Sequence, residues 1–130
     1  MGSVNYLAVV VAAVAAFVAA LGYYVAFGAQ LQKFGSAAAE QERPSPWLAP
    51  VELLRHLIVA AVVAALAVAA GLTTWTSGLL LGLGLWVGFP VVLLAGSVFH
   101  EKVPWRLAAL HAGDWLLKLL IVGTVVAAWR

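Results

Sequence analysis

Three ionisable side chains lie close together in an apolar stretch near the end of the chain, and their types are those that bind and pass protons. His111, Asp114 and Lys118 are spaced i, i+3 and i+7 in the sequence HAGDWLLKLL, so a helix would place all three on one face. Asp114 and Lys118 are at the i, i+4 spacing, at which a carboxylate and an ammonium group form an ion pair along a helix. The pattern predicts a polar site with His111 beside a neutralised Asp114–Lys118 pair.

The depth of this site in the membrane determines how much free energy the Asp114–Lys118 pairing saves. At about 1.5 Å per residue from Trp105, Asp114 lies about 13 Å and Lys118 about 20 Å along the segment, near the middle of a bilayer core about 30 Å thick. An unpaired charge at that depth costs about 2.5–3.5 kcal/mol. We therefore expect the pair to face the interior of the protein.

Two roles for the Asp114–Lys118 pair stay open. A structural pair would neutralise two buried charges and hydrogen-bond a neighbouring segment, with Asn5 or Thr124 as the candidate partner. A functional pair would mark a path for a proton, an ion or a small solute, because ionisable groups within membranes commonly lie on such paths. We place Asn5 together with His111, Asp114 and Lys118 in one predicted intramembrane polar site.

A second histidine offers a different chemistry. His56 and His111 start from the same side of the membrane and lie at similar depth, so two facing imidazoles could ligate a haem or a metal ion. Neither stands in a recognised ligand motif, and the chain has no cysteine to supply a thiolate. We therefore expect no bound cofactor and no metal, and keep a haem or metal carrier as an alternative.

Patterns that carry other chemistry are missing from the sequence. The serines stand in no G-x-S-x-G or S-x-x-K context, and the glycine-rich GLLLGLGLWVG lacks the lysine that a phosphate-binding loop needs. The net charge is only +2 and no cluster of Lys and Arg accompanies it, so nucleic acid is not an expected partner. We expect a protein that is not an enzyme.

The elements that must position these residues are membrane-spanning helices. The chain has 130 residues, of which 65% are hydrophobic and 9% charged, too few polar groups to cover a soluble domain. A bilayer needs roughly 20 apolar residues per helix. Within a single domain, residues 1–130, four segments meet that length: 4–27, 51–72, 76–99 and 104–129. The sequence predicts an all-α, polytopic membrane protein, with four transmembrane helices in an antiparallel bundle.

The charges on the connections predict the orientation of this bundle. The long first connection, residues 28–50, could hold a short interfacial helix, and it shares a side with the third connection. Basic residues flank these two connections more than the opposite side: Lys33, Arg43, Arg55, Lys102 and Arg106 against Arg130. The positive-inside rule then places both termini outside the cell membrane, expected to be a bacterial inner membrane.

Glycines and a proline shape the third segment. Gly78 and Gly82 form one pair of small residues at helical spacing, and Gly84 and Gly88 form another on a different face, so two neighbouring helices could approach closely. Pro90 removes a backbone hydrogen bond and clashes with the preceding turn. We therefore expect a bend near the middle of this segment.

Both ends of the chain resemble a known family. The opening VNYLAVVVAAVAAFVAALGYYVAFGAQLQKF carries Asn5 near its start and Gly22, Tyr23 and Tyr24 near its end, and the closing segment reads RLAALHAGDWLLKLLIVGTVVAAW. This pattern resembles a family of small bacterial membrane proteins, domain of unknown function 1761, although the aromatic pair expected there is Trp-Tyr. The resemblance implies a four-span bundle over nearly the whole chain, and it implies no activity.

These features predict a small multi-pass membrane protein without enzymatic activity. It would lie in the lipid bilayer as a homo-oligomer, or as an accessory or assembly subunit of a larger membrane complex. The alternative is a homo-oligomeric channel or transporter that uses the polar site for protons, ions or a small solute. Four spans leave little room for a cavity within one chain, so we expect transport to need an oligomer.

Overall fold

The computed structural model describes residues 4–27 and 48–129, most of which are helical. The helices are α1 (Tyr6–Ala26), α4 (Leu48–Ala69), α5 (Trp75–Gly88), α6 (Pro90–His100) and α7 (Trp105–Ala128). α1, α4 and α7 are each long and apolar enough to cross a membrane, and α5 and α6 together make a fourth such segment. The predicted all-α architecture with four spans is confirmed. The interfacial helix expected after α1 lies outside the described residues.

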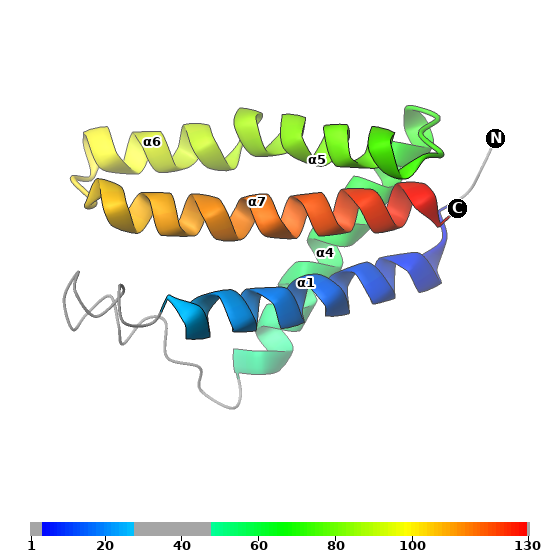
Figure 1. Ribbon diagram of the computed structural model, residues 1–130, viewed down its shortest axis with the longest axis horizontal. Helices are drawn as coiled ribbons and strands as arrows, with labels where there is room; N and C mark the ends of the chain where they lie inside the picture. The colour runs from blue at the N-terminus through cyan, green and yellow to red at the C-terminus, as the bar shows by residue number, and fades with distance from the viewer. Residues whose placement is uncertain (1–3, 28–47, 130) are drawn as a thin grey trace.

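α7 is the central helix of the bundle. It contacts the other four helices: α5 and α6 lie along one side of it, α1 lies along the other, and α4 runs obliquely to both α1 and α7 (Figure 1). The start of α1, the α4–α5 turn and the end of α7 lie at one end of the bundle, and the α6–α7 turn lies at the opposite end (Figure 1). The polar residues of α7 are therefore placed where more than one helix can contact them.

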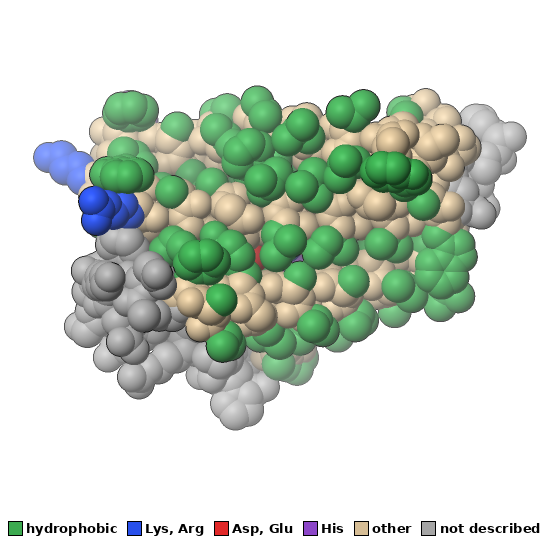
Figure 2. Space-filling model, in the orientation of Figure 1, with side chains coloured by type: hydrophobic (Ala, Val, Ile, Leu, Met, Phe, Trp, Pro, Cys, Tyr) green, Lys and Arg blue, Asp and Glu red, His purple; other side chains and the backbone are tan. Residues whose placement is uncertain are grey.

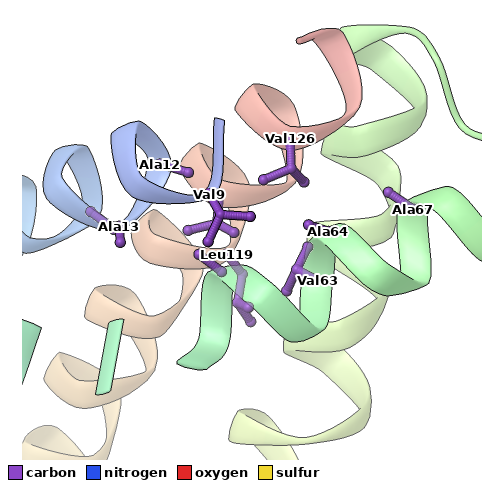
Figure 3. Close-up of a cluster of buried hydrophobic side chains, with 11 residues drawn as sticks. Val9, Ala12, Ala13, Val63, Ala64, Ala67, Leu119 and Val126 are labelled. Atoms are coloured by element: carbon purple, nitrogen blue, oxygen red, sulfur yellow. The ribbon is translucent and has the colours of Figure 1, made fainter. Parts of the chain in front are cut away.

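The core between α1, α4 and α7 is built mainly from small side chains. Figure 3 shows alanine and valine side chains of the three helices meeting around Leu119. Lipid tails are as apolar as this core, so the helices gain little from hydrophobic burial alone and associate through close van der Waals contact. The buried cluster consists of Val9, Ala12, Ala13, Ala16, Ala60, Val63, Ala64, Ala67, Leu119, Val122 and Val126.

The outer surface of the bundle is apolar. Figure 2 shows hydrophobic side chains spread over the helices of one face, with Lys and Arg gathered at the end where α6 meets α7. Large side chains such as Val18, Ile58, Leu80 and Leu93 are more than half exposed. In a soluble monomer such a surface would drive aggregation, whereas in a bilayer it faces lipid tails. The surface therefore agrees with a multi-pass membrane protein.

α4 begins and ends three residues earlier than the sequence predicted. It starts at Leu48 because Pro50 lies within the first turn, where a missing backbone N–H breaks no helical hydrogen bond. It ends at Ala69 because Gly71 adopts a left-handed conformation with φ +70°. The N–H of Gly71 donates to the carbonyl of Val68, and the N–H of Leu72 donates to that of Ala67, which closes the helix in a Schellman motif.

The third span is broken at its middle, as Pro90 predicted. α5 ends at Gly88 and α6 begins at Pro90, with Phe89 between them at φ −122° and ψ −74°, outside the helical region. The start of this span is fixed by a capping box, in which Ser77 N–H donates to Thr74 Oγ1 and Thr74 N–H donates to Ser77 Oγ. The predicted bend is confirmed.

Among the described residues, the Gly78/Gly82 pair seats a neighbouring helix and the Gly84/Gly88 pair does not. A Cβ added to Gly78 would collide with the backbone of Gly123, and one added to Gly82 would collide with the backbone of Leu119, so α5 lies directly against α7. Nothing lies within 4 Å of the same position on Gly84 or Gly88. The packing role of the second pair stays a prediction, because among the described residues α7 fills only the Gly78/Gly82 face of α5.

Candidate functional site

The predicted ion pair is present and buried. Lys118 Nζ lies 2.7 Å from Asp114 Oδ2, and the two side chains are 12% and 3% exposed. Lys118 Nζ also lies 4.9 Å from the ring centroid of Trp115, so an aromatic face covers part of the ammonium group. Two opposite charges therefore share one low-dielectric site, in which removing either one would leave the other uncompensated.

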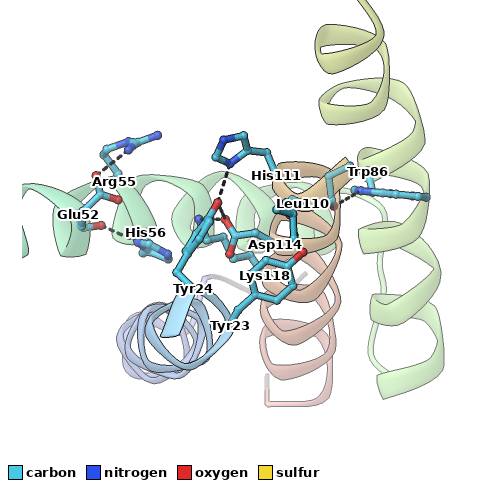
Figure 4. Close-up of polar contacts among 11 residues, drawn as sticks. Tyr23, Tyr24, Glu52, Arg55, His56, Trp86, Leu110, His111, Asp114 and Lys118 are labelled. Atoms are coloured by element: carbon cyan, nitrogen blue, oxygen red, sulfur yellow. Dashed lines mark hydrogen bonds and ion pairs between the residues drawn. The ribbon is translucent and has the colours of Figure 1, made fainter. Parts of the chain in front are cut away.

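Tyr24 extends the pair into a network that joins α1 to α7 (Figure 4). The carboxylate of Asp114 can only accept, so the Tyr24 hydroxyl donates to Asp114 Oδ2 at 3.2 Å. The Tyr24 oxygen lies 2.8 Å from His111 Nδ1. Since its one proton is used on Asp114, this oxygen accepts from His111, which assigns the imidazole proton to Nδ1. The donors point in one direction, from His111 through Tyr24 to Asp114.

Two further side chains hold this part of α7 from opposite sides. The Tyr23 hydroxyl donates to the carbonyl of Leu110 at 2.5 Å, and Trp86 Nε1 donates to the carbonyl of Ala112 at 2.7 Å (Figure 4). Gly113 leaves room for the Tyr23 ring, because a Cβ there would collide with the tyrosine hydroxyl. α1 and α5 therefore fix the turn of α7 that presents Asp114.

A half-open cavity of about 220 Å³ lies beside the network, between α1, α4 and α7. Its lining residues are Ala16, Glu52, Arg55, His56, Ile58, Val59, Trp115, Lys118 and Val122. The expectation that one chain leaves little room for a cavity was too strict, because this space is lined by residues of a single chain, among them the small Ala16 of α1. The ammonium group that pairs with Asp114 thus also faces an accessible space.

His56 lines this cavity and is 6% exposed. Its Nδ1 lies 2.6 Å from the carbonyl of Glu52, which can only accept, so Nδ1 carries a proton. Its Nε2 is buried with no hydrogen-bond partner among the described residues, and the same holds for Asp114 Oδ1. A buried polar atom without a partner marks a position where a ligand, a water or a proton can bind.

Asn5 does not belong to the polar site, which corrects the sequence prediction. Its Oδ1 accepts from the N–H groups of Leu7 and Ala8 and caps α1, while its Nδ2 donates to the carbonyl of Trp129 at 3.3 Å. It thus lies at the end of the bundle where α1 begins and α7 ends (Figure 1). An Asn at a helix start satisfies free N–H groups, and its spacing in the sequence could not distinguish this role from a polar site.

His56 and His111 are engaged by different groups. His56 bonds Glu52 on its own helix, and His111 bonds Tyr24 of α1 (Figure 4). No group of three His, Cys, Asp or Glu residues that could hold a metal ion occurs in residues 4–27 and 48–129. The charged residues that line the cavity beside His56 are Lys118, which pairs with Asp114, and Arg55 and Glu52, which pair with each other.

The chain matches the model of the family described as Protein of unknown function (DUF1761) over residues 7–127. It belongs to the DUF1761 family. No curated protein and no solved structure matches it. The family resemblance seen in the sequence is therefore confirmed, and what a DUF1761 protein does must be inferred from the site itself.

Sequence reasoning missed the side chains that the structure brings together around Asp114. Tyr23 and Tyr24 were noted only as an aromatic pair of the family, although their hydroxyls make the cross-helix hydrogen bonds. The available signal was that two neighbouring hydroxyls near the end of an apolar helix each need a partner when buried. Trp86, inside the third span, carried the same signal through its indole N–H.

Proposed function

We propose that this chain is a multi-pass membrane protein that binds a small solute together with a proton at the Asp114 site and carries both through the membrane. No chemical conversion of the solute is involved. The observation that carries the proposal is the connected series His111, Tyr24, Asp114 and Lys118 beside a cavity, with Asp114 Oδ1 still unpartnered among the described residues. A purely structural pair would be expected to have its buried polar atoms satisfied.

The position of the apolar core supports a carrier rather than an open channel. His111, Asp114 and Lys118 lie progressively further along α7, from the end with the charged α6–α7 turn toward the middle. Beyond Lys118, Leu119, Val122 and Val126 of α7 belong to the buried apolar core cluster, and of these three only Val122 also lines the cavity (Figure 3). The polar path thus extends through half of the bundle, and passage through the other half requires the helices to rearrange.

Reconstituted liposomes test this function. Purified protein is placed in vesicles that hold a pH-sensitive dye, and small organic acids, amines, amino acids and sugars are added outside in turn. One class of solute should change the internal pH faster than in empty vesicles, and Asp114→Asn should reduce that rate at least tenfold. Glu101→Gln, which removes an exposed acid in the α6–α7 turn, serves as the matched control and should leave the rate unchanged. If no solute class moves protons, the carrier function is rejected.

We also propose that the α6–α7 turn faces the cytoplasm of the cell and that both termini face outward. The charge distribution supports this orientation, because basic residues concentrate around the connections on that side. The chain contains no cysteine, so a single introduced cysteine is the one site on the chain that a thiol reagent can label. A membrane-impermeant thiol reagent should label Thr73→Cys on intact cells and label Lys102→Cys only after the membrane is opened. The reverse pattern would invert the proposed topology.

Association with a second copy or with another membrane protein is a second candidate role. It is favoured by Gly84 and Gly88, whose face of α5 has nothing within 4 Å among the described residues, while Leu80 and Val87 beside them are exposed. Such a face admits a helix of a neighbouring chain closely. Native mass spectrometry should show an oligomer that Gly84→Leu converts to monomer, whereas Gly96→Leu on α6 should not. A monomer in the unsubstituted protein excludes self-association.

A further inference from the structure

The cavity between α1, α4 and α7 has both polar and apolar lining residues. Lys118, His56 and the Glu52–Arg55 ion pair supply the polar lining, and the Trp115 ring stands beside Lys118. The remaining lining is mainly aliphatic and comes from all three helices: Ala16, Ile58, Val59 and Val122. Ile58 and Arg55 are exposed, so they mark the mouth of the cavity on the outer side of α4. Such a lining suits a molecule with one polar head and an apolar body.

His56 is the neutral group in the polar lining that can accept a proton. Because its Nδ1–H is donated to the Glu52 carbonyl, Nε2 of the neutral ring is a buried acceptor without a partner among the described residues, on a side chain that lines the cavity. A charged imidazolium would place a buried N–H donor there, with no acceptor among the described residues. The empty site therefore holds the neutral ring, ready to accept a hydrogen bond from an O–H group or to take its proton.

The charges that face His56 favour an anion over a cation. Lys118 and Asp114 of α7 and Glu52 of its own helix act on the ring electrostatically, and the Phe17 ring of α1 packs against it at near-perpendicular orientation, with 5.7 Å between the ring centroids. Asp114 is neutralised by Lys118, and Glu52 is neutralised by Arg55 at 2.7 Å. The ammonium group of Lys118 has three protons, so after the bond to Asp114 it can still donate to a bound anion.

We propose that this cavity is the binding site for a small organic acid with an apolar body, taken up as the free acid. The carboxyl O–H gives its proton to Nε2 of His56, and the resulting carboxylate is held between the imidazolium and the Lys118 ammonium. One proton leaves oxygen and one joins nitrogen, so the net charge of the occupied site is that of the empty site plus a neutral molecule. The substrate class rests on the proposed carrier function, and it explains how a proton enters the membrane with the solute.

The size of the cavity limits the acid. About 220 Å³ is less than the volume of a usual drug-sized pocket, so a whole lipid molecule does not fit inside. A carboxylic acid with a short hydrocarbon chain places its head at His56 and Lys118 and its carbons against Ile58, Val59 and Val122. The arrangement of Glu52, Arg55 and His56 on α4 and of Lys118 on α7 is visible in Figure 4.

Calorimetric titration of the purified full chain in detergent tests the site, with hexanoate, hexylamine and hexanol as probes. Hexanoate should bind saturably, and hexylamine and hexanol should bind at least tenfold more weakly. Since hexanoate is ionised above pH 7 and His56 starts neutral, each bound molecule should take up one proton from solution. The affinity should therefore fall about tenfold per pH unit between pH 7 and pH 8.5. Equal binding of hexylamine, or binding of hexanoate without proton uptake, overturns the proposal.

Variants separate the two groups that hold the head. His56→Gln cannot accept a proton, so proton uptake should vanish and hexanoate affinity should fall at least tenfold. Asp114→Asn with Lys118→Met removes the ammonium without stranding the carboxylate, and should lower the affinity to a similar extent. Glu101→Gln should bind as the unsubstituted chain does. Retention of affinity and proton uptake by folded His56→Gln contradicts the assignment.

The outcomes distinguish the acid site from the carrier function. Hexanoate binding with proton uptake, but no solute-driven pH change in any vesicle, would support the acid-binding site and reject the carrier function. Proton-coupled movement of another solute class by a chain that does not bind hexanoate would reject the acid and leave the carrier. If a variant fails to fold, the ratio of hexanoate to hexylamine binding in the unsubstituted chain still decides the proposal.

Discussion

The two sides of α7 differ in how closely they pack and in how polar they are. Toward α5, Gly78 and Gly82 bring two backbones into direct contact at Gly123 and Leu119, and no space is left between the helices. Toward α1 and α4, the same helix presents a buried ion pair, cross-helix hydrogen bonds and a cavity. The side toward α5 is close-packed, whereas the side toward α1 and α4 combines a buried apolar core with a polar network and a cavity.

This difference shows how a small bundle can hold charges in its interior. Close contact with α5 and the indole hydrogen bond from Trp86 to Ala112 fix α7 in place. The fixed helix then presents Asp114 and Lys118 to α1 and α4 without relying on those charges for its own position. Substitutions on the α5 side of α7 should therefore mainly affect the stability of the bundle. Substitutions on the side toward α1 and α4 should also affect the chemistry of the polar site.

The largest loss of stability is expected from Gly82→Leu on the close-packed side. The new side chain meets the backbone of Leu119, which cannot move without displacing α7. Overpacking of this kind should lower the free energy of unfolding by about 3 kcal/mol or more, or prevent folding. Thermal unfolding in detergent provides the measurement. Gly84→Leu, two residues along α5 and away from α7, is the matched control for this contact and should lower the stability of the chain less than Gly82→Leu.

Equal destabilisation by Gly82→Leu and Gly84→Leu would mean that helix propensity or lipid contact, rather than the α5–α7 contact, sets the cost. In that case the close contact between α5 and α7 would not be what stabilises this side of the helix. A tolerated Gly82→Leu would show that α5 can move away from α7, in which case the turn that carries Asp114 is less firmly held than the hydrogen bonds indicate.

The sequence predicted elements and local pairs well because both depend on nearby residues. The lengths of the apolar segments predicted four spans, and the i, i+4 spacing predicted the Asp114–Lys118 pair. Pro90 predicted the interruption of the third span. Contacts between helices were harder to predict from the sequence. Asn5 was assigned to the polar site, although its role as a helix cap places it at the other end of α1.

Cross-helix partners require the relative rotation of the helices, which no local pattern encodes. The glycine pairs 78/82 and 84/88 look alike in sequence, and only packing shows that α7 fills the first. The contribution of Tyr24 was hidden for the same reason, since its hydroxyl reaches Asp114 only because α1 and α7 run side by side. The cavity was likewise unforeseen, because it depends on the oblique path of α4 (Figure 1).

On the polar side, Asp114 and Lys118 should behave as one unit. Either Asp114→Asn or Lys118→Met strands a buried charge and should cost about 2.5–3.5 kcal/mol, or neutralise the remaining partner. The double variant leaves no unpaired charge and should recover most of that loss. A double-mutant cycle measured by chemical unfolding should give a favourable coupling of at least about 0.5–1 kcal/mol. Additive losses would show that each group depends on a separate partner, and the ion pair would not define this side of α7.

The smallest stability change, and the most specific functional one, is expected from the two neighbouring tyrosines. Tyr23→Phe and Tyr24→Phe each remove one hydroxyl from α1 and should each lower the free energy of unfolding by about 0.5–1.5 kcal/mol. Only Tyr24 links His111 to Asp114, whereas Tyr23 bonds a backbone carbonyl. Tyr24→Phe should therefore slow solute-driven proton movement in vesicles at least tenfold, while Tyr23→Phe should leave it within about twofold. If both variants transport alike, the hydroxyl of Tyr24 only positions α1, and protons reach Asp114 from the cavity through Lys118 and His56 instead.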